Sequence, residues 1–298
     1  MSWPDRVRVA TPAKVNLGLE VIARRPDGYH EIVSVLQSVS LFDLFEWTAT
    51  RRPFNYLGFD DIAPEQDLVA RALAHARDAE RWTGTLSARK GIPAAAGLGG
   101  GSSDAALALR ISLPNATGEE LLDRAARLGS DVSFFLSSGT ALASGTGSTL
   151  APLATPRLWF VLVTPPLAIA GKTQALYRGL DARDFTDGAV VRGIADRLGR
   201  GTGPGDIIPN AFTNRLMSFP VVRYAYDRLL LAGSSVVSIS GAGPTVYAVL
   251  ESYHDASRVA ARLPLDVGAI RIARTIAARD QPSVSAMALA MRGPAERV

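Results

Sequence analysis

The glycine-rich stretch KGIPAAAGLGGGSSDAAL, at residues 90–107, places the tightest restriction on how this chain can fold. Four of the five residues at 97–101 are glycine, and two serines and an aspartate then lead into a run of alanine and leucine. A loop with so few Cβ atoms lets backbone N–H groups approach a ligand closely, and the run after it predicts a helix over residues 103–111 whose N-terminus faces the loop. Such an arrangement suits an anion, above all a chain of phosphates.

Three known nucleotide-binding loops are alternatives for this stretch. The lysine-containing P-loop is excluded, because Ser102 and Ser103 follow the glycines with no lysine between them. The dinucleotide fingerprint is disfavoured, because a Pro/Asn/Gly turn occupies residues 111–118, where its next strand should form. The protein-kinase glycine loop lies in a hairpin and does not lead into a helix. A turn that merely caps a buried helix is also disfavoured, since so many glycines lose much conformational freedom on folding.

The length and composition of the chain restrict its class. A chain of 298 residues predicts two domains, and 47% apolar with 20% charged residues is typical of a globular protein. The absence of cysteine excludes disulfides, thiolate nucleophiles and cysteine-bound zinc. Only three histidines occur, far apart in the sequence, so we expect no histidine metal site. A net charge of +4 with scattered arginines does not indicate a nucleic-acid partner.

The N-terminal residues predict the location of the protein. They contain neither an apolar signal core nor an Arg/Ser-rich transit segment, and no apolar run reaches the length of a membrane span. We therefore expect a cytoplasmic protein with no membrane partner. The sequence leaves the oligomeric state open.

Strand-like patterns dominate the first fifty residues. Apolar and polar residues alternate over residues 14–21, which predicts a half-buried strand with Lys14 and Asn16 on one face. A turn at residues 24–28 leads into a second β segment that extends to Trp47. Residues 51–65 are rich in Pro, Gly, Asn and Asp and predict a loop.

Helices and short strands are expected next. Asp67 is predicted to cap a helix that runs to about Trp82 and stops at Gly84. The sequence TGEE, which begins at Thr117, is typical of a capping box. The other elements expected before residue 155 are a strand at 85–89, helices at 103–111, 119–128 and 132–136, and a short strand between turns at 137–149.

A change of domain is expected at about residue 155. An apolar strand at 159–163 ends at two prolines, and more helices and strands follow. The helices are expected at 173–180, 190–198, 211–217, 220–231 and 256–263, and the strands at 235–240, 245–250 and 269–275. The resulting β-α-β-β-α-β order is typical of a split βαβ sandwich. We therefore expect domains at residues 1–155 and 156–276 and a poorly ordered tail at 277–298.

Three separated motifs resemble, in order, those of the small-molecule kinase superfamily that includes galactokinase, homoserine kinase and mevalonate kinase. They are PAKVNLGL near the N-terminus, the glycine loop with its preceding proline, and SISGAGPTVY near residue 240. The resemblance implies an α+β enzyme with an N-terminal domain like domain 2 of ribosomal protein S5 and a ferredoxin-like C-terminal domain. It also implies an active site in the cleft between the two domains, with ATP at the glycine loop.

Further segments resemble the 4-diphosphocytidyl-2-C-methyl-D-erythritol kinases of that superfamily. They are RRPDGYHEI, KGIP, LGSDVSFF, GKTQALY and PNAF, at residues 24–32, 90–93, 128–135, 171–177 and 209–212. That family uses ATP to phosphorylate the 2-hydroxyl of its substrate in the non-mevalonate route to isoprenoid precursors. The resemblance implies ATP and Mg²⁺ as cofactors and a small-molecule substrate that carries a cytidine diphosphate group. The alternatives are another alcohol kinase of the mevalonate or homoserine kinase type and a catalytically silent nucleotide-binding protein.

The resemblance implies that Asp131 is the catalytic base and that Lys14 is its partner. Lys14 would lie beside Asp131 and stabilise negative charge on the attacking oxygen. From the residues alone, Asp131 could instead cap the helix at 132–136, and Lys14 could be a solvated strand residue.

The other implied site residues form two groups. The ATP-binding residues are Pro93, Ala94, Ala95, Ala96, Gly97, Leu98, Gly99, Gly100, Gly101, Ser102 and Ser103. The substrate-binding residues are Asn16, Tyr29, His30, Thr173, Tyr177, Gly241, Gly243 and Thr245. No carboxylate cage for magnesium is evident, which fits an ion held mainly by phosphate oxygens and water, with Ser102 or Ser103 assisting.

Two tyrosines and a histidine are implied to recognise the cytosine ring. Tyr29 and Tyr177 would sandwich the ring, and His30 would bond to its polar edge. From the residues alone, Tyr29 could be a strand aromatic, Tyr177 a helix core residue and the glycines near residue 240 a tight turn.

The chain departs from the family pattern in a few places. Ser130 and Ser133 replace the usual Ala and Pro beside Asp131, and Ser148 stands where GxGE is usual. Gly171 and Lys172 replace the common small pair before the threonine. Ser130 and Ser133 flank Asp131 without replacing it, so we expect them to adjust local packing. Lys172 directly precedes Thr173, so we expect it to bear on the contacts at the cytidine side of the substrate.

Overall fold

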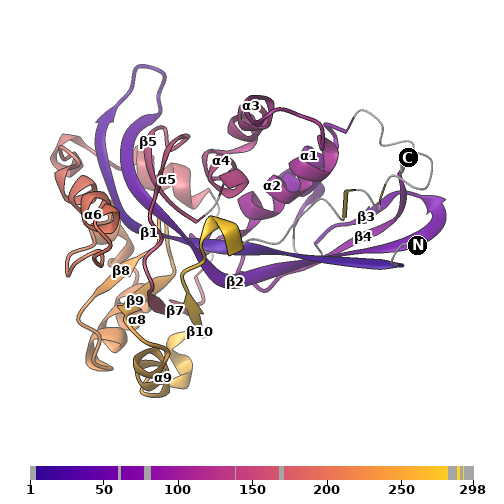
Figure 1. Ribbon diagram of the computed structural model, residues 1–298. Coiled ribbons are helices and arrows are strands. Elements are labelled where there is room, and N and C mark those ends of the chain that lie inside the picture. The colour runs from indigo at the N-terminus through magenta and orange to yellow at the C-terminus, as the bar shows by residue number, and fades with distance from the viewer. Residues whose placement is uncertain are drawn as a thin grey trace.

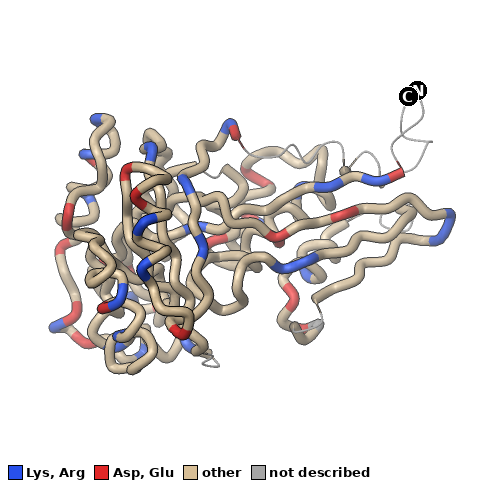
Figure 2. Tube along the Cα trace, turned by 90° about the horizontal axis from the view of Figure 1, so that it is seen from below, with Lys and Arg blue, Asp and Glu red and all other residues tan. Residues whose placement is uncertain are grey.

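Two long antiparallel strands, β1 (Arg6–Arg24) and β2 (His30–Pro53), extend through much of the molecule (Figure 1). The computed structural model describes residues 5–59, 62–76, 82–137, 139–167, 171–280, 287–288 and 291. Pairing runs from Arg6 opposite Thr48 to Arg24 opposite His30, and the register shifts three times along the way. Basic and acidic residues are scattered along the whole described trace (Figure 2).

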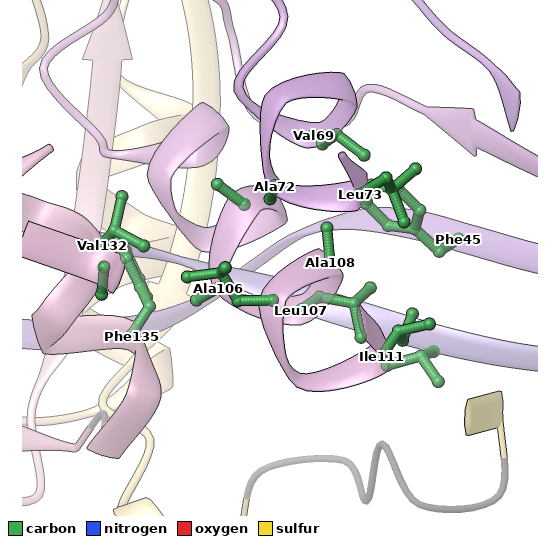
Figure 3. Close-up of a cluster of buried hydrophobic side chains, with 14 of the residues drawn as sticks. Phe45, Val69, Ala72, Leu73, Ala106, Leu107, Ala108, Ile111, Val132 and Phe135 are labelled. Atoms are coloured by element: carbon green, nitrogen blue, oxygen red, sulfur yellow. The ribbon is translucent and has the colours of Figure 1, made fainter. Parts of the chain in front are cut away.

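The first sheet has the order β3-β4-β2-β5-β6, with β1 paired to β2. Its other strands are β3 (Asn55–Leu57), β4 (Thr83–Arg89), β5 (Thr140–Gly145) and β6 (Thr149–Leu153). Four helices pack together on one side of it (Figure 1), namely α1 (Leu68–Leu73), α2 (Gly100–Ser112), α3 (Gly118–Leu128) and α4 (Ser130–Ser137). Their apolar faces meet the sheet in a core that includes Phe45, Ile111 and Val132 (Figure 3).

The second sheet has the order β10-β7-β9-β8, and every neighbouring pair is antiparallel. Its strands are β7 (Trp159–Thr164), β8 (Val237–Ile239), β9 (Val246–Leu250) and β10 (Ala269–Arg274). The helices of this half are α5 (Lys172–Arg178), α6 (Ala189–Gly199), α7 (Thr213–Leu216), α8 (Pro220–Leu231) and α9 (Tyr253–Ala261). This strand order is that of a split βαβ sandwich, so the expected α+β class and ferredoxin-like second half are confirmed.

A shared core joins the two sheets. Val15 and Leu17 of β1 belong to the same buried cluster as Phe160 of β7 and Ile194 of α6. At Gly18, with φ +105°, a Cβ would lie only 2.8 Å from Val191 of α6, so this close contact needs a glycine. The strand that carries Lys14 and Asn16 is therefore packed against both halves.

Several expected boundaries are wrong. The segment at 51–65 is not all loop, because β2 continues to Pro53 and β3 follows it. Asp67 caps α1 as expected, but the helix ends at Leu73 and not near Trp82. Gly84 lies inside β4, where the indole of Trp47 packs over it and leaves no room for a Cβ.

Other differences are smaller. The helix α2 begins at Gly100, three residues before the predicted start, and α7 and β8 are shorter than predicted. Short 3₁₀ helices lie at Pro64–Gln66, Ala182–Asp184, Leu265–Val267 and Ala278–Asp280. Among the described residues, no helix combines the length and apolar character needed to cross a bilayer.

The chain leaves the first sheet at Leu153 and enters the second at Trp159. This is where the domain change at residue 155 is expected, and the division into domains stays a prediction. Much of the expected tail at 277–298 lies outside the described residues. Met287 and Met291 are fully buried in the first core, so these two positions are packed.

Candidate active site

Lys14 of β1 and Asp131 of α4 meet at the centre of the site. The Lys14 side chain is 5% exposed, and its Nζ lies 3.5 Å from Oδ2 of Asp131. It also donates to Oδ1 of Asn16 at 2.5 Å, as two strand residues on one face can do. Asp131 is the second residue of α4, so the alternative that it caps a helix beginning at residue 132 is wrong.

The Asn16 amide is held in one orientation. Its Nδ2 donates to Ser34 Oγ at 2.9 Å, and Ser34 Oγ donates to Gly18 O at 2.7 Å. The Tyr247 hydroxyl donates to the Asn16 carbonyl oxygen at 2.5 Å. These contacts leave Oδ1 directed at the Lys14 ammonium. Ser34 is a site residue that the sequence analysis did not identify.

The carbonyl groups of five consecutive glycine-loop residues all accept hydrogen bonds from the protein. The donor to Ala95 O is Lys172 Nζ at 2.6 Å, and the donor to Ala96 O is Thr245 N at 3.2 Å. The remaining donors are Ser240 Oγ to Gly97 O at 2.9 Å, Lys14 N to Leu98 O at 2.9 Å and Ser103 N to Gly99 O at 3.0 Å. The loop is therefore pinned through its oxygens.

The N–H groups of the loop remain available. Within the described chain, no N–H group of residues 94–102 donates a hydrogen bond to a protein acceptor. Gly99, with φ +71°, precedes α2, so the residues from Gly100 to Ser103 form the first turn of a helix and not the end of a loop. Free N–H groups at the start of a 13-residue helix form an environment that favours an anion.

A second glycine loop closes against the first. At Gly97 a Cβ would lie 2.2 Å from Ser240 O, and at Gly241 it would lie 2.9 Å from Asn16 Oδ1. Both residues also have positive φ, so each position needs a glycine for its backbone conformation as well as for lack of space. Thr245 is fully buried, and its hydroxyl lies 2.8 Å from that of Thr164 at the end of β7. Its N–H donates to Ala96 O, and this bond fastens the two loops together.

Many of the predicted site residues line one cavity between these loops. Those that line it are Lys14, Asn16, Gly97, Gly99, Asp131, Thr173, Tyr177 and Gly241. Lining residues that the sequence analysis did not assign to the site include Ser34, Thr146, Gly147 and Phe212. Residues from β1, β2, α4, α5 and both glycine loops thus meet around one space.

The expected cytosine-binding residues lie close together only in part. The His30 and Tyr177 rings are 5.0 Å apart and tilted by 31°, and Phe185 approaches His30 edge-on at 6.2 Å. Nε2 of His30 is buried with no hydrogen-bond partner among the described residues, and burial lowers the pKa of this histidine. Tyr29 is 66% exposed on the neighbouring turn. A sandwich of Tyr29 and Tyr177 stays a prediction.

A buried charge cluster lies at the base of the glycine loop. Asp43 accepts hydrogen bonds from Gly91 N at 2.7 Å and Ile92 N at 2.8 Å. Lys90 pairs with both Asp43 and Asp104. Since two buried carboxylates share one ammonium, burial and the Asp43 charge raise the pKa of Asp104 to about 7, although Lys90 opposes this shift.

Comparison with known proteins identifies the class. The family described as GHMP kinases N terminal domain matches residues 67–139, and the family described as GHMP kinases C terminal matches residues 206–268. The fold is also similar to a homoserine kinase from Cytophaga hutchinsonii, with a TM-score of 0.66 at 15% identity over 93% of this chain and 98% of that chain. The two sheets, the interlocked glycine loops and these matches define a small-molecule kinase of the GHMP class.

Relatives with higher identity identify the family. A 4-diphosphocytidyl-2-C-methyl-D-erythritol kinase from Dehalococcoides mccartyi is 37% identical over 83% of this chain and 90% of its own length. One from Pelotomaculum thermopropionicum is 37% identical over 88% of this chain and 96% of its own length. A crystal structure of 4-(cytidine 5'-diphospho)-2C-methyl-D-erythritol kinase has a TM-score of 0.76 at 31% identity and covers 90% of this chain and 99% of its own. The chain belongs to the 4-diphosphocytidyl-2-C-methyl-D-erythritol kinase family.

Proposed function

We propose that this kinase transfers the terminal phosphoryl group of ATP to the 2-hydroxyl of 4-diphosphocytidyl-2-C-methyl-D-erythritol, in the non-mevalonate route to isoprenoid precursors. The observation that carries the proposal is the Lys14–Asp131 pair at 3.5 Å in a cavity walled by both glycine loops. The names of the relatives supply the substrate. A cytoplasmic location stays a prediction.

Asp131 is the proposed base for the acceptor hydroxyl. At 35% side-chain exposure it can reach a ligand, whereas Lys14 is nearly buried beside it. The Lys14 ammonium would stabilise negative charge on the attacking oxygen, and Asn16 would orient the hydroxyl. Because phosphoryl transfer has a loose transition state, positioning contributes as much as proton removal.

The free N–H groups of residues 94–102 are the proposed phosphate-binding groups. Mg²⁺ would neutralise phosphate charge during the transfer. Ser102, in the first turn of α2, is the hydroxyl that fits this ion best, because Ser103 is buried at 3% exposure. No cluster of three or more acidic, histidine or cysteine side chains placed to share an ion occurs in the described part of the chain, so phosphate and water oxygens would complete the coordination.

The His30 ring is the proposed reader of the cytosine edge. A buried ring nitrogen without a partner is costly unless a ligand satisfies it. Tyr177 lines the cavity and packs beside His30, so it can contact the base, and Tyr29 would cover the other face.

A substrate panel tests this function. Purified protein with ATP and Mg²⁺ is offered 4-diphosphocytidyl-2-C-methyl-D-erythritol, mevalonate or homoserine, and ³¹P–¹H correlation identifies the phosphorylated position. We expect turnover of the cytidylyl substrate alone, with phosphate on the 2-hydroxyl. Turnover of another alcohol would favour a different kinase of the class, and ATP binding without any turnover would favour a silent nucleotide-binding protein.

A further inference from the structure

Lys172 is a buried cation whose side chain joins the two glycine loops. It is the first residue of α5 and 7% exposed. Its Nζ donates to Ala95 O at 2.6 Å and to Gly243 O. Ala95, with φ +51°, and Gly243, with φ +61°, both have left-handed backbone, so the lysine contacts each loop where its chain turns sharply.

Among the described residues, the ammonium of Lys172 has acceptors for two of its three N–H donors. A lysine carries three N–H donors, and the two acceptors of Lys172 are neutral carbonyls. No carboxylate pairs with it among the described residues, and burial lowers its pKa to about 8. A buried ammonium without a counter-charge gains most from an anion placed beside it.

Space for such an anion lies next to Lys172. A second cavity is lined by Ala95, Gly97, Gly171, Lys172, Thr173, Gln174, Ala242 and Gly243. Lys172 is the only charged side chain in this lining. The cavity shares Gly97, Thr173 and Ala242 with the one that holds Lys14 and Asp131, so the two spaces adjoin.

Lysine is rare in this chain, which supports a specific role for Lys172. Lys14, Lys90 and Lys172 are the only lysines among 32 lysine and arginine residues. Lys14 lines the cavity that also holds Asp131, and Lys90 lies at the base of the glycine loop. A compact ammonium fits where a planar guanidinium would not.

We propose that Lys172 binds the terminal phosphate of ATP through its free N–H, in the cavity between the two glycine loops. It would thus provide the charge that the glycine loop itself lacks, since no lysine follows the glycines. This inference rests on the proposed function for its ligand. It deepens that proposal by assigning a role to a residue at which the chain departs from the family pattern.

Nucleotide affinity with and without Lys172 tests the proposal. Dissociation constants of Mg-ATP, Mg-ADP, AMP and CDP are measured by calorimetry for the wild type and Lys172→Met, with Arg178→Met as a control that removes an exposed cation from the same helix. We expect Lys172→Met to weaken ATP binding about ten- to hundredfold, ADP less, and AMP and CDP hardly at all. The control should bind all four like the wild type. An equal loss for every nucleotide, or a loss for CDP alone, would overturn the proposal.

The pH dependence gives a readout that a purely structural lysine would not change. As the pH rises from 7.5 to 9.5 the wild-type ammonium is lost, so ATP affinity should fall, while Lys172→Met should show a flatter profile. Lys14 and Asp131 in the adjoining cavity, and Tyr177 on α5, are present in both proteins, so the difference reports Lys172. Parallel profiles would contradict a phosphate contact. If the wild type bound no ATP at all, the proposed function itself would fail.

Discussion

The side chains of Lys14 and Asn16 leave no room for even one added carbon atom at Gly241. A Cβ at Gly241 would lie 2.9 Å from Asn16 Oδ1 and 3.3 Å from Lys14 Nζ, the two groups proposed to face the acceptor hydroxyl. Because a shift of about 1 Å can cost about a hundredfold in rate, this glycine is a direct test of the positioning.

We predict that Gly241→Ala lowers turnover about a hundredfold and stability by about 1–2 kcal/mol, the second effect arising from its φ of +52°. Gly201→Ala is the matched control, because Gly201 has φ +75° with nothing within 4 Å of a Cβ. It should lose similar stability and keep its turnover. Steady-state kinetics with urea unfolding separates the two effects, and equal turnover in both variants would refute the positioning role.

The buried carboxyl group of Asp104 makes the free energy of unfolding depend on pH. Its pKa is raised in the folded protein from 3.8 to about 7, so the stability that it contributes is complete below about pH 4 and is lost as the pH rises through 7. We predict that the free energy of unfolding of Asp104→Asn falls less than that of the wild type between pH 5 and 8. Urea unfolding at both pH values measures it, and the same fall in both proteins would contradict the assignment.

At the scale of elements, the glycine loop is held by its neighbours. Donors from β1, α5 and the second glycine loop fix its carbonyls, which keeps its N–H groups free for a ligand. The backbone of Gly97 lies so close to the Ser240 carbonyl oxygen that no side chain fits at position 97.

We predict that Gly97→Ala destabilises the protein by about 2 kcal/mol or more and abolishes ATP binding, because its Cβ would lie 2.2 Å from Ser240 O. Gly193→Ala, inside α6 with nothing within 4 Å, should instead gain about 0.5–1 kcal/mol. Thermal unfolding and ATP titration check both. Unchanged ATP binding in Gly97→Ala would show that the interlock does not support the nucleotide site.

The sequence predicted elements best where periodicity and caps are local. The strand around Lys14, the Asp67 cap and the full extent of α8 were all readable from the chain. The predicted half-burial of that strand is wrong, because residues 11–21 are buried on both faces. The end of α1 and the start of α2 were not. At Gly100, the first residue of α2, a Cβ would lie 3.1 Å from Asp43 Oδ2 of β2, a tertiary contact that no local pattern shows. The Lys172 contacts join residues 77 and 71 positions apart, and no local pattern shows such pairs.

At the scale of the whole molecule, the active site depends on both sheets being joined. The core shared by β1, β7 and α6 holds Lys14 and Asn16 at the meeting point of the two glycine loops. The order of the second sheet followed from the β-α-β-β-α-β pattern. That Lys14 lies beside Asp131 was implied by the family resemblance, and the structure gives the distance of 3.5 Å between their side chains.

The rate of phosphoryl transfer in Asp131→Asn tests the central claim most directly. With ATP and 4-diphosphocytidyl-2-C-methyl-D-erythritol bound, a single-turnover experiment measures the transfer, and calorimetry measures ATP binding in the same variant. We predict a transfer rate about 10²- to 10⁴-fold below that of the wild type, with ATP affinity within about twofold. Transfer at the wild-type rate would contradict the account of Asp131 as the base.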